Sequence, residues 1–399
     1  MRLLFVTNRN IITTSGELRL IKNRAEALFS EYNISTDFLV FQKESRVNAK
    51  KKEIINAGGS LCTYTMNIKR PVTSILNYCK MVKTISNRVK KENIDAVIFS
   101  GPGLAGLAEK VKKVSSCKVI IDVHGSSEDI VELTKNKEFS KRLVSNLIYR
   151  IEKNGFKKGF KYADGCFVVT GALADYIKKN YHTKNIDFFQ VPCATTDIPE
   201  DIKYIFDNRK IYREKYGIKE NEIVFIYSGG VSSWQCVEET VELYKRLKNS
   251  IKKPLRLLCF SHNKERIQEL VGATRDVVVD SYLPHELEKA LFAGDFAFML
   301  RKNCITNNVA FPNKYLEYVK SGMKIITTPY VFEIANQITD NGVGFLYDFS
   351  GNIQEIANYV EEKAHSYGDD WNQRNIILNN NSFKTRLKPF VAFLWGKEE

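Results

Sequence analysis

The sequence predicts an α/β fold made of two doubly wound domains, and three features support this prediction. Short apolar runs rich in Val, Ile and Phe alternate with longer amphipathic stretches, which is typical of βα units around a parallel sheet. The alternation occurs in two series, separated by a polar break around residues 193–221. The 399 residues, 44% of them hydrophobic, suffice for two packed cores.

The expected elements follow in order along the chain. The first series contains six expected strands: RLLFVT, TDFLVF, DAVIFS, KVIIDV, GCFVVT and DFFQVP. The second series contains six more: EIVFIYSG, LRLLCFS, DVVVDSY, DFAFMLR, KIITTP and GVGFLYD. A last helical segment at 382–396 comes after the second sheet is complete. We therefore expect domains at 1–195 and 196–381, and a closing segment 382–399 whose helix is free to pack back on the first domain.

Positive charge is concentrated in the N-terminal half. Residues 1–195 contain 33 Lys and Arg against 18 Asp and Glu, a net charge of +15, whereas the remainder has 27 against 28, a net charge of −1. Basic clusters lie at 50–52, 69–70, 110–113 and 135–161. So basic a half predicts an anionic partner such as a phospholipid surface, a lipid diphosphate or a nucleic acid. The alternative is a basic surface that only keeps the protein soluble. Because no nucleic-acid-binding module or aromatic-interleaved basic motif is present, we expect no nucleic-acid partner.

Other protein classes are disfavoured by what the sequence lacks. No uncharged run reaches the roughly 18–20 residues of a membrane span, and MRLLFVTNRN does not read as a leader, so we expect a cytoplasmic protein. The eight cysteines occur singly with no CxxC pair. We expect them to be reduced core thiols.

Polar residues follow several of the expected strands, where doubly wound sheets bind ligands and where a helix N-terminus favours anions. Gly16 either cradles a phosphate with its loop or is an ordinary loop glycine, and His124 either contacts a ligand or occupies a plain turn. Ser228, Gly229 and Gly230, followed by Ser232, form a strand-to-helix turn that suits close approach of a diphosphate, although such glycine pairs also occur in ordinary turns.

The segment FPNKYLEY, residues 311–318, opens a helix with charged residues. Lys314 lies in the expected first turn, and Glu317 follows three residues later on the same side. Arg301 ends a strand shortly before. The neighbouring Phe311, Tyr315 and Tyr318 indicate partly buried surroundings, and the alternative is a solvated ion pair between Lys314 and Glu317.

Residues 139–161, FSKRLVSNLIYRIEKNGFKKGFK, read as a basic amphipathic helix. Phe139, Leu143, Leu147 and Ile151 recur at helical spacing. The basic residues around them are Lys141, Arg142, Arg150, Lys153, Lys157 and Lys158. Such a helix lies on an anionic membrane, or its apolar stripe faces the core of the first domain, and the sequence leaves both readings open.

Several motifs together resemble a known family. They are DVHG with Glu128 after it, FVVTGALADYI, VPCATTD, YSGGVSSWQ and, most specifically, MLRKNCITNNVAFPNKYLEYVKSGMKIITT. Over nearly its whole length the chain resembles a glycosyltransferase of the GT-B fold, of the retaining family 4 type (glycosyl transferases group 1).

The resemblance implies two Rossmann-like domains that face each other across a cleft. The second domain then binds a nucleoside-diphosphate sugar: Glu317 holds the ribose, while Arg301 and Lys314 neutralise the diphosphate. His124 acts as a polar contact to the transferred sugar. Further donor contacts fall on Gly16, Ser228, Gly229, Gly230, Ser232 and Asn313. With these cations and no D-x-D motif, we expect neither a metal nor any other cofactor.

The same resemblance also implies what the basic first domain binds. It implies that this domain receives a glycan or lipid-linked acceptor at the inner face of a bacterial cell membrane, for cell-envelope polysaccharide or glycolipid synthesis. The enzyme is then cytoplasmic and peripheral to the membrane, with the basic residues of 139–161 facing the membrane or the acceptor.

Two departures from the family pattern bear on function. The usual E-x(7)-E would place its first acid at Val309, and the usual Arg and Lys of the glycine turn fall at Gly230 and Gln235. The diphosphate would then rely on Arg301, Lys314 and backbone donors. A sugar-nucleotide epimerase or hydrolase of the same fold, or a catalytically silent membrane-binding relative, are the alternative functions.

Overall fold

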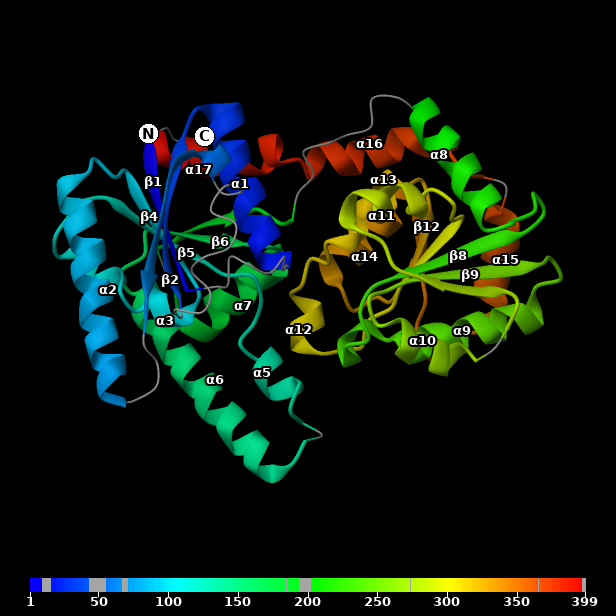
Figure 1. Ribbon diagram of the computed structural model, residues 1–399, viewed down its shortest axis with the longest axis horizontal. Helices are drawn as coiled ribbons and strands as arrows, with labels where there is room; N and C mark the ends of the chain where they lie inside the picture. The colour runs from blue at the N-terminus through cyan, green and yellow to red at the C-terminus, as the bar shows by residue number, and fades with distance from the viewer. Residues whose placement is uncertain are drawn as a thin grey trace. The chain divides into compact units, whose positions relative to one another are not determined.

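The computed structural model describes residues 1–8, 16–42, 55–66, 71–135, 137–183, 185–193, 202–272, 274–364 and 366–396. The chain divides into two compact units, Met1–Thr196 with Ser382–Glu399, and Asp197–Asn381 (Figure 1). Each unit holds a parallel sheet with helices on both faces, so the predicted doubly wound fold is confirmed. The domain boundary expected at 195/196 falls in 194–201, outside the described residues, as do the loop 9–15 and the basic runs 50–52 and 69–70.

The sheet of the first unit has the order β3-β2-β1-β4-β5-β6-β7. All six predicted strands are present, and β3 is the strand that the prediction missed. Its sequence GGSLCTYT has no apolar run, because it is an edge strand on which no residue is fully buried. The strands are β1 (Arg2–Thr7), β2 (Ser35–Gln42), β3 (Gly58–Thr65), β4 (Ala96–Ser100), β5 (Lys118–Asp122), β6 (Gly165–Val168) and β7 (Asp187–Gln190).

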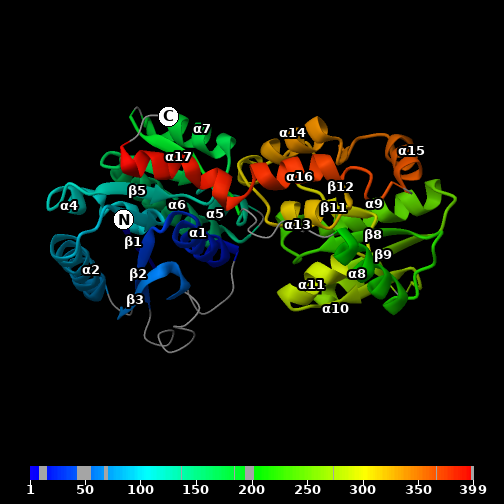
Figure 2. The ribbon, with the colours of Figure 1, turned by 90° about the horizontal axis from the view of Figure 1, so that it is seen from above.

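The helices of the first unit include one from the far end of the chain. Helix α17 packs against α1 and β7 (Figure 2). The ring of its Phe390 lies 4.5 Å from that of Phe167 and 5.3 Å from that of Phe189, centroid to centroid. The helices are α1 (Gly16–Tyr32), η2 (Ile55–Ala57), α2 (Pro71–Lys91), α3 (Pro102–Ala105), α4 (Ala108–Lys112), α5 (Asp129–Glu132), α6 (Phe139–Phe160), α7 (Gly171–Tyr181) and α17 (Phe383–Trp395).

The sheet of the second unit has the order β10-β9-β8-β11-β12-β13 and contains all six predicted strands. They are β8 (Ile223–Ser228), β9 (Leu255–Phe260), β10 (Val277–Asp280), β11 (Phe296–Met299), β12 (Lys324–Thr327) and β13 (Gly344–Leu346). The strand order reverses between β8 and β11. In doubly wound sheets the carboxyl ends of the two strands at such a reversal are where ligands bind.

Helices cover both faces of this second sheet. Helix α9 packs against both α10 and α15. Helix α8 packs against α11, and α16 packs against both α13 and α14. The helices are α8 (Ile202–Lys215), η3 (Ser233–Gln235), α9 (Val237–Ser250), α10 (Lys264–Val271), α11 (Pro284–Leu291), α12 (Ile305–Asn308), α13 (Lys314–Lys320), α14 (Phe332–Asn341), α15 (Ile353–Lys363) and α16 (Trp371–Asn380).

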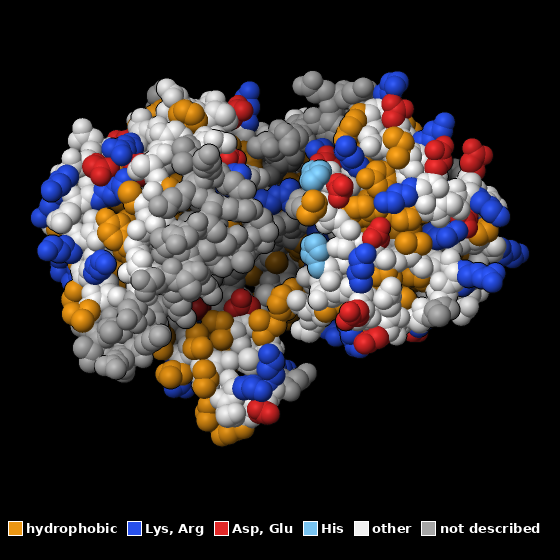
Figure 3. Space-filling view, in the orientation of Figure 1, with side chains coloured by type: hydrophobic (Ala, Val, Ile, Leu, Met, Phe, Trp, Pro, Cys, Tyr) orange, Lys and Arg blue, Asp and Glu red, His pale blue; other side chains and the backbone are white. Residues whose placement is uncertain are grey.

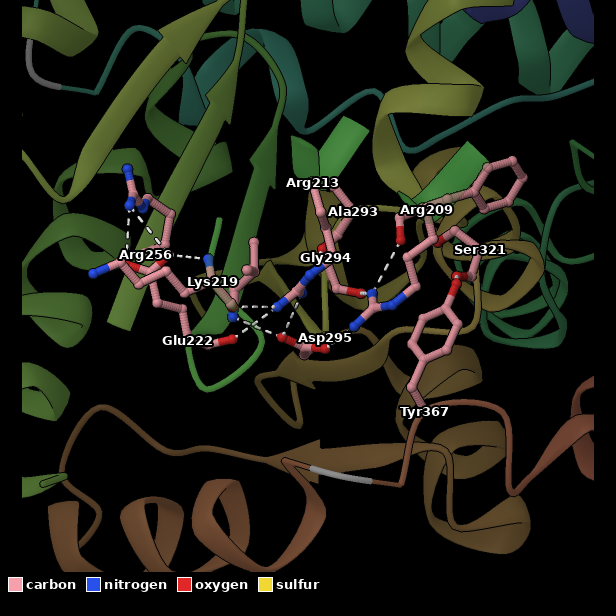
Figure 4. Close-up of polar contacts among 12 residues, drawn as sticks. Arg209, Arg213, Lys219, Glu222, Arg256, Ala293, Gly294, Asp295, Ser321 and Tyr367 are labelled. Atoms are coloured by element: carbon pink, nitrogen blue, oxygen red, sulfur yellow. Dashed lines mark hydrogen bonds and ion pairs between the residues drawn. The ribbon is translucent and has the colours of Figure 1, made fainter. Parts of the chain in front are cut away.

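A buried carboxylate anchors α8 to the sheet of the second unit (Figure 4). Asp295, just before β11, accepts hydrogen bonds from Arg209, from Arg213 at 3.4 Å and from the backbone N–H of Val224 at 2.7 Å. The Arg209 guanidinium also lies 3.9 Å from the centroid of the Tyr367 ring. One carboxylate therefore joins α8, β8 and β11.

We expect Asp295→Ala to lower the free energy of unfolding by about 3 kcal/mol, because it leaves two largely buried guanidinium groups without their carboxylate. Urea denaturation measures this loss. Asp207→Ala is the matched control, since it breaks an exposed pair with Lys203 and should cost less than about 1 kcal/mol. Equal stability of the two variants would show that Asp295 is not an anchor.

The cysteine prediction is partly wrong. None of the eight cysteines forms a disulfide, and five of them are buried. Cys62 and Cys304 are half-buried and Cys79 is exposed, because they lie on an edge strand, before a short helix and on α2 respectively. Within the described ranges, no helix has the length and apolarity needed to cross a membrane.

Candidate active site

The turn after β8 is held in place by tyrosines and the neighbouring strand. The backbone N–H of Ser228 donates to the Tyr318 hydroxyl at 3.1 Å, and that of Gly229 donates to the Phe260 carbonyl at 2.9 Å. The Tyr227 hydroxyl donates to the Gly230 carbonyl at 2.5 Å. The turn 228–230 is therefore a fixed feature at the carboxyl end of β8.

Lys314, the first residue of α13, reaches this turn. Its amine donates a hydrogen bond to the Ser228 carbonyl and lies 5.8 Å from the centroid of the Tyr227 ring. A Cβ atom built on Gly229 would lie 2.2 Å from the Lys314 Nζ and 2.5 Å from the Gln235 Oε1. A glycine at this position therefore leaves the space beside it to the lysine amine.

Burial and, to a smaller extent, the positive charge of Arg301 lower the pKa of the Lys314 amine to about 7, while Glu317 acts in the opposite direction. The alternative of a solvated Lys314–Glu317 ion pair is therefore wrong for the amine, which is desolvated and bound to a backbone carbonyl. A desolvated cation that repels another cation is poised to accept a negative charge.

Arg301 supplies that second cation. It follows β11, is 8% exposed, and its backbone is fixed by Thr328: the Arg301 N–H donates to the Thr328 Oγ1 at 3.1 Å, and that hydroxyl donates to the Arg301 carbonyl at 2.7 Å. Burial lowers the pKa of its guanidinium. Among the described residues, neither Arg301 nor Lys314 has a carboxylate within ion-pair distance. The two cations therefore form a candidate anion site.

The other donor residues predicted in the second unit lie on α13, just before it and just before η3. Glu317 lies one turn after Lys314 on α13 and is half-buried, and Asn313 precedes the helix without capping it through its side chain. Ser232 precedes η3, and its carbonyl accepts a hydrogen bond from the Gln235 N–H at 2.8 Å. Val309, where the family pattern has an acid, is 5% exposed at the end of α12.

In the first unit, His124 is held by a buried aspartate. The Nε2 of His124 lies 2.8 Å from the Asp122 Oδ2, and the Arg24 Nη1 donates to the Asp122 Oδ1 at 2.8 Å. Burial alone would raise the pKa of Asp122, but the charges and hydrogen bonds of Arg24 and His124 outweigh it and hold this pKa well below its ordinary value. Asp122 therefore stays ionised and fixes the orientation of the His124 ring. Gly16 is the first residue of α1.

The basic residues predicted on 139–161 lie on α6. Lys141, Arg142, Arg150, Lys157 and Lys158 are exposed, whereas Lys153 is half-buried and donates to the Tyr149 hydroxyl at 3.0 Å. The four apolar residues of the predicted stripe, Phe139, Leu143, Leu147 and Ile151, are all exposed. The alternative that this stripe faces the core is therefore wrong.

Sequence reasoning missed the residues that position the predicted ones. Asp122 could have been found, because it lies two residues before His124 at the same strand end. Arg24, Tyr227 and Tyr318 carry no comparable signal, since their roles depend on how α1, β8 and α13 pack. In the part of the chain that the structure describes, no group of three or more His, Cys, Asp or Glu side chains is placed to hold a metal ion.

The sequence of the second unit is similar to a known protein family. Residues 208–380 match the family Glycosyl transferases group 1. The match covers most of the second unit. No curated protein sequence matches the chain significantly.

Solved structures extend the similarity over the whole chain. A glycosyltransferase from Rickettsia africae has a TM-score of 0.69 at 16% identity, over 99% of this chain and 98% of that one. WaaG, a glycosyltransferase of lipopolysaccharide biosynthesis, has a TM-score of 0.66 at 17% identity, over 99% and 100%. HepE from Anabaena in complex with UDP has a TM-score of 0.67 at 12% identity, over 99% and 100%. The chain therefore has the GT-B glycosyltransferase fold, as its sequence predicts.

Proposed function

We propose that this protein is a glycosyltransferase that moves a sugar from a nucleoside-diphosphate sugar to a glycan acceptor. The observation that carries this proposal is the pair of desolvated cations, Arg301 and Lys314, beside the fixed turn 228–230 in a unit that matches the group 1 family. When the bond between sugar and phosphate breaks, negative charge develops on the leaving diphosphate. Cations already in place at that point lower the barrier by several kcal/mol.

Each predicted site residue has a role in this reaction. Arg301 and Lys314 receive the diphosphate, Glu317 binds the ribose hydroxyls, and His124, oriented by Asp122, contacts the transferred sugar. Asn313, Ser232, Gly16 and the turn 228–230 supply further polar contacts to the donor. The similar HepE was solved with UDP, which supports a nucleotide donor of this kind here.

The finer features of the reaction are also part of the proposal. We propose that the two cations make a metal unnecessary, and that the transfer retains the anomeric configuration, as the resemblance of residues 299–328 implies. The acceptor is a lipid-linked or polymeric glycan of the cell envelope. The enzyme works in the cytoplasm at the anionic inner surface of the cell membrane, as the basic charge of residues 1–195 favours.

Thermal unfolding with a panel of nucleotides and nucleotide sugars tests the donor site. We expect one nucleoside diphosphate, at 100 times its dissociation constant, to stabilise the protein by about 2.7 kcal/mol. Glu317→Ala should abolish this shift. Glu355→Ala is the matched control, because it removes an exposed acid from the first turn of α15 in the same unit.

The outcomes separate the candidate functions. A shift lost only in Glu317→Ala supports the donor site, and sugar transfer to added acceptor then supports the transferase. Conversion of the nucleotide sugar without any acceptor would favour an epimerase or a hydrolase. No shift with any nucleotide would contradict the proposal and favour a silent membrane-binding protein.

A further inference from the structure

Helix α6 exposes its apolar side to solvent. Phe139, Leu143, Val144, Leu147, Ile148 and Ile151 have exposed fractions between 43% and 73%. All six lie in the first 13 residues of the helix, and Leu143, Leu147 and Ile151 follow one another at spacings of four, so they form one ridge. An amphipathic helix of a globular domain ordinarily buries this side. The ridge, residues 139–151, is therefore an unpartnered apolar surface.

The opposite side of α6 is the one that packs against the domain, and it is partly polar. Ser145 is buried, and Tyr149 donates a hydrogen bond to Glu128 at 3.0 Å. Farther along, a Cβ on Gly155 would lie 2.3 Å from the Pro102 carbonyl oxygen, and one on Gly159 would lie 2.8 Å from that of Ala105. The glycines let α6 approach α3 closely, and these contacts fix which side of the helix faces outward.

The exposed ridge lies on a projection of the first unit. The N-terminal half of α6, with α5 beside it, extends away from the sheet of this unit (Figure 1). Hydrophobic side chains gather over this projection, with basic side chains among them (Figure 3). A surface of this shape can reach a flat partner without bringing the sheet of the unit close to it.

The charge around the ridge is mainly positive, although Glu138, just before the helix, pairs with Lys141 at 3.1 Å, and the half-buried Glu152 follows the ridge. Residues 139–151 contain Lys141, Arg142 and Arg150 and no Asp or Glu, and Lys157 and Lys158 follow on the same helix, all five exposed. Basic residues beside an apolar surface match a bilayer that carries anionic headgroups over a hydrocarbon interior. Apolar insertion and charge attraction then act together on the same helix.

We propose that the ridge of α6 inserts into an anionic phospholipid bilayer and anchors the protein there. This deepens the proposed function by naming the surface through which the enzyme meets its membrane, although the argument rests on α6 alone. Apolar side chains enter the boundary of the acyl chains, and the lysines and arginines remain among the headgroups.

Co-sedimentation of the full chain with vesicles tests this inference. We expect binding to vesicles of phosphatidylcholine with 30% phosphatidylglycerol, and weaker binding to phosphatidylcholine alone. Leu147→Glu with Ile151→Glu should weaken binding to the anionic vesicles by about tenfold or more, because two exposed apolar side chains no longer enter the bilayer. Ile211→Glu on α8, at a position 56% exposed in the second unit, is the matched control and should bind like the wild type.

A second variant separates insertion from charge attraction. In Leu147→Trp, the indole fluorescence should shift to the blue and be quenched by lipids brominated in their acyl chains. The basic-to-neutral variant Arg150→Gln with Lys157→Gln and Lys158→Gln should lose mainly the preference for anionic vesicles, with a shallower dependence on salt.

Three results would overturn the inference. The first is unchanged vesicle binding by the Leu147→Glu, Ile151→Glu variant. The second is an indole in Leu147→Trp that remains exposed to water when the protein is bound to vesicles. The third is a dimer in solution that the Leu147→Glu, Ile151→Glu variant dissociates and the other variants do not. The last would assign the ridge to a second copy of the chain. Nucleotide stabilisation of the same samples keeps the two proposals apart: vesicle binding without a nucleotide shift would support the anchor and contradict the transferase.

Discussion

Lys314→Met is expected to lower the rate of sugar transfer by about 10²–10³-fold while the protein still folds. The amine is one of two cations placed for the developing charge of the diphosphate, and loss of one such preorganised donor costs an enzyme about this much. Steady-state transfer kinetics measure the loss. Lys363→Met, at the end of α15, is the matched control and should leave the rate unchanged.

The thermal stability of Lys314→Met should not fall with its activity. Since the pKa of Lys314 is about 7 in the folded protein and 10.5 when exposed, the unfolded chain binds more protons between these values, and this group disfavours folding at neutral pH. Its unfavourable effect is full below pH 7 and is relieved as the pH rises towards 10.5. We therefore expect the Tm of Lys314→Met at pH 7 to equal or exceed that of the wild type. A variant that loses stability along with activity would contradict this role.

Donor binding should also take up a proton through Lys314. A bound diphosphate raises the pKa of the amine, so the affinity should fall by about tenfold per pH unit above pH 7, until the pKa of the complex is reached. Calorimetry in buffers of different ionisation enthalpy measures this uptake. Gly229→Ala should reduce it, because the new Cβ would displace the amine, whose flexible side chain can move without unfolding the domain. Undiminished uptake in this variant would exclude Lys314 as the proton acceptor.

The fold could be predicted largely because most of its strands are buried on both faces. Twelve of the thirteen strands read as apolar runs, and β3 was missed because an edge strand with no fully buried residue needs no such run. The helix bearing Lys314 could also be predicted, since Pro312 and Asn313 mark its start.

The candidate site could be predicted only in part. A strand end pointed to Arg301 and the first turn of a helix to Lys314, but what the Lys314 amine contacts depends on how α13 packs against β8. Sequence suggested that Gly229 leaves room for a diphosphate, whereas in the described structure the space beside it is taken by the amine. Likewise, helical spacing gave the apolar stripe of α6 but not its direction, because spacing is the same for a stripe that faces the core and for one that faces solvent.

Asp122→Asn is expected to lower the free energy of unfolding at pH 7 by about 3–5 kcal/mol. The change removes the negative charge beside Arg24, which is 3% exposed and has no other carboxylate in the described ion pairs, and an unpaired buried cation is costly. Urea denaturation measures the loss, and Asp175→Asn, which breaks an exposed pair with Lys178, should cost less than about 1 kcal/mol.

The pH dependence and a double variant identify the source of this loss. Because the pKa of Asp122 lies below its ordinary value in the folded protein, its contribution is complete above about pH 4 and is lost as the pH falls through the folded pKa. The difference between wild type and Asp122→Asn should therefore shrink below pH 4. Adding Arg24→Leu should recover part of the stability at pH 7 by removing the unpaired cation, but not transfer activity, since the His124 ring would still lack its carboxylate. Recovery of activity in the double variant would mean that Asp122 acts only through Arg24 and does not orient His124.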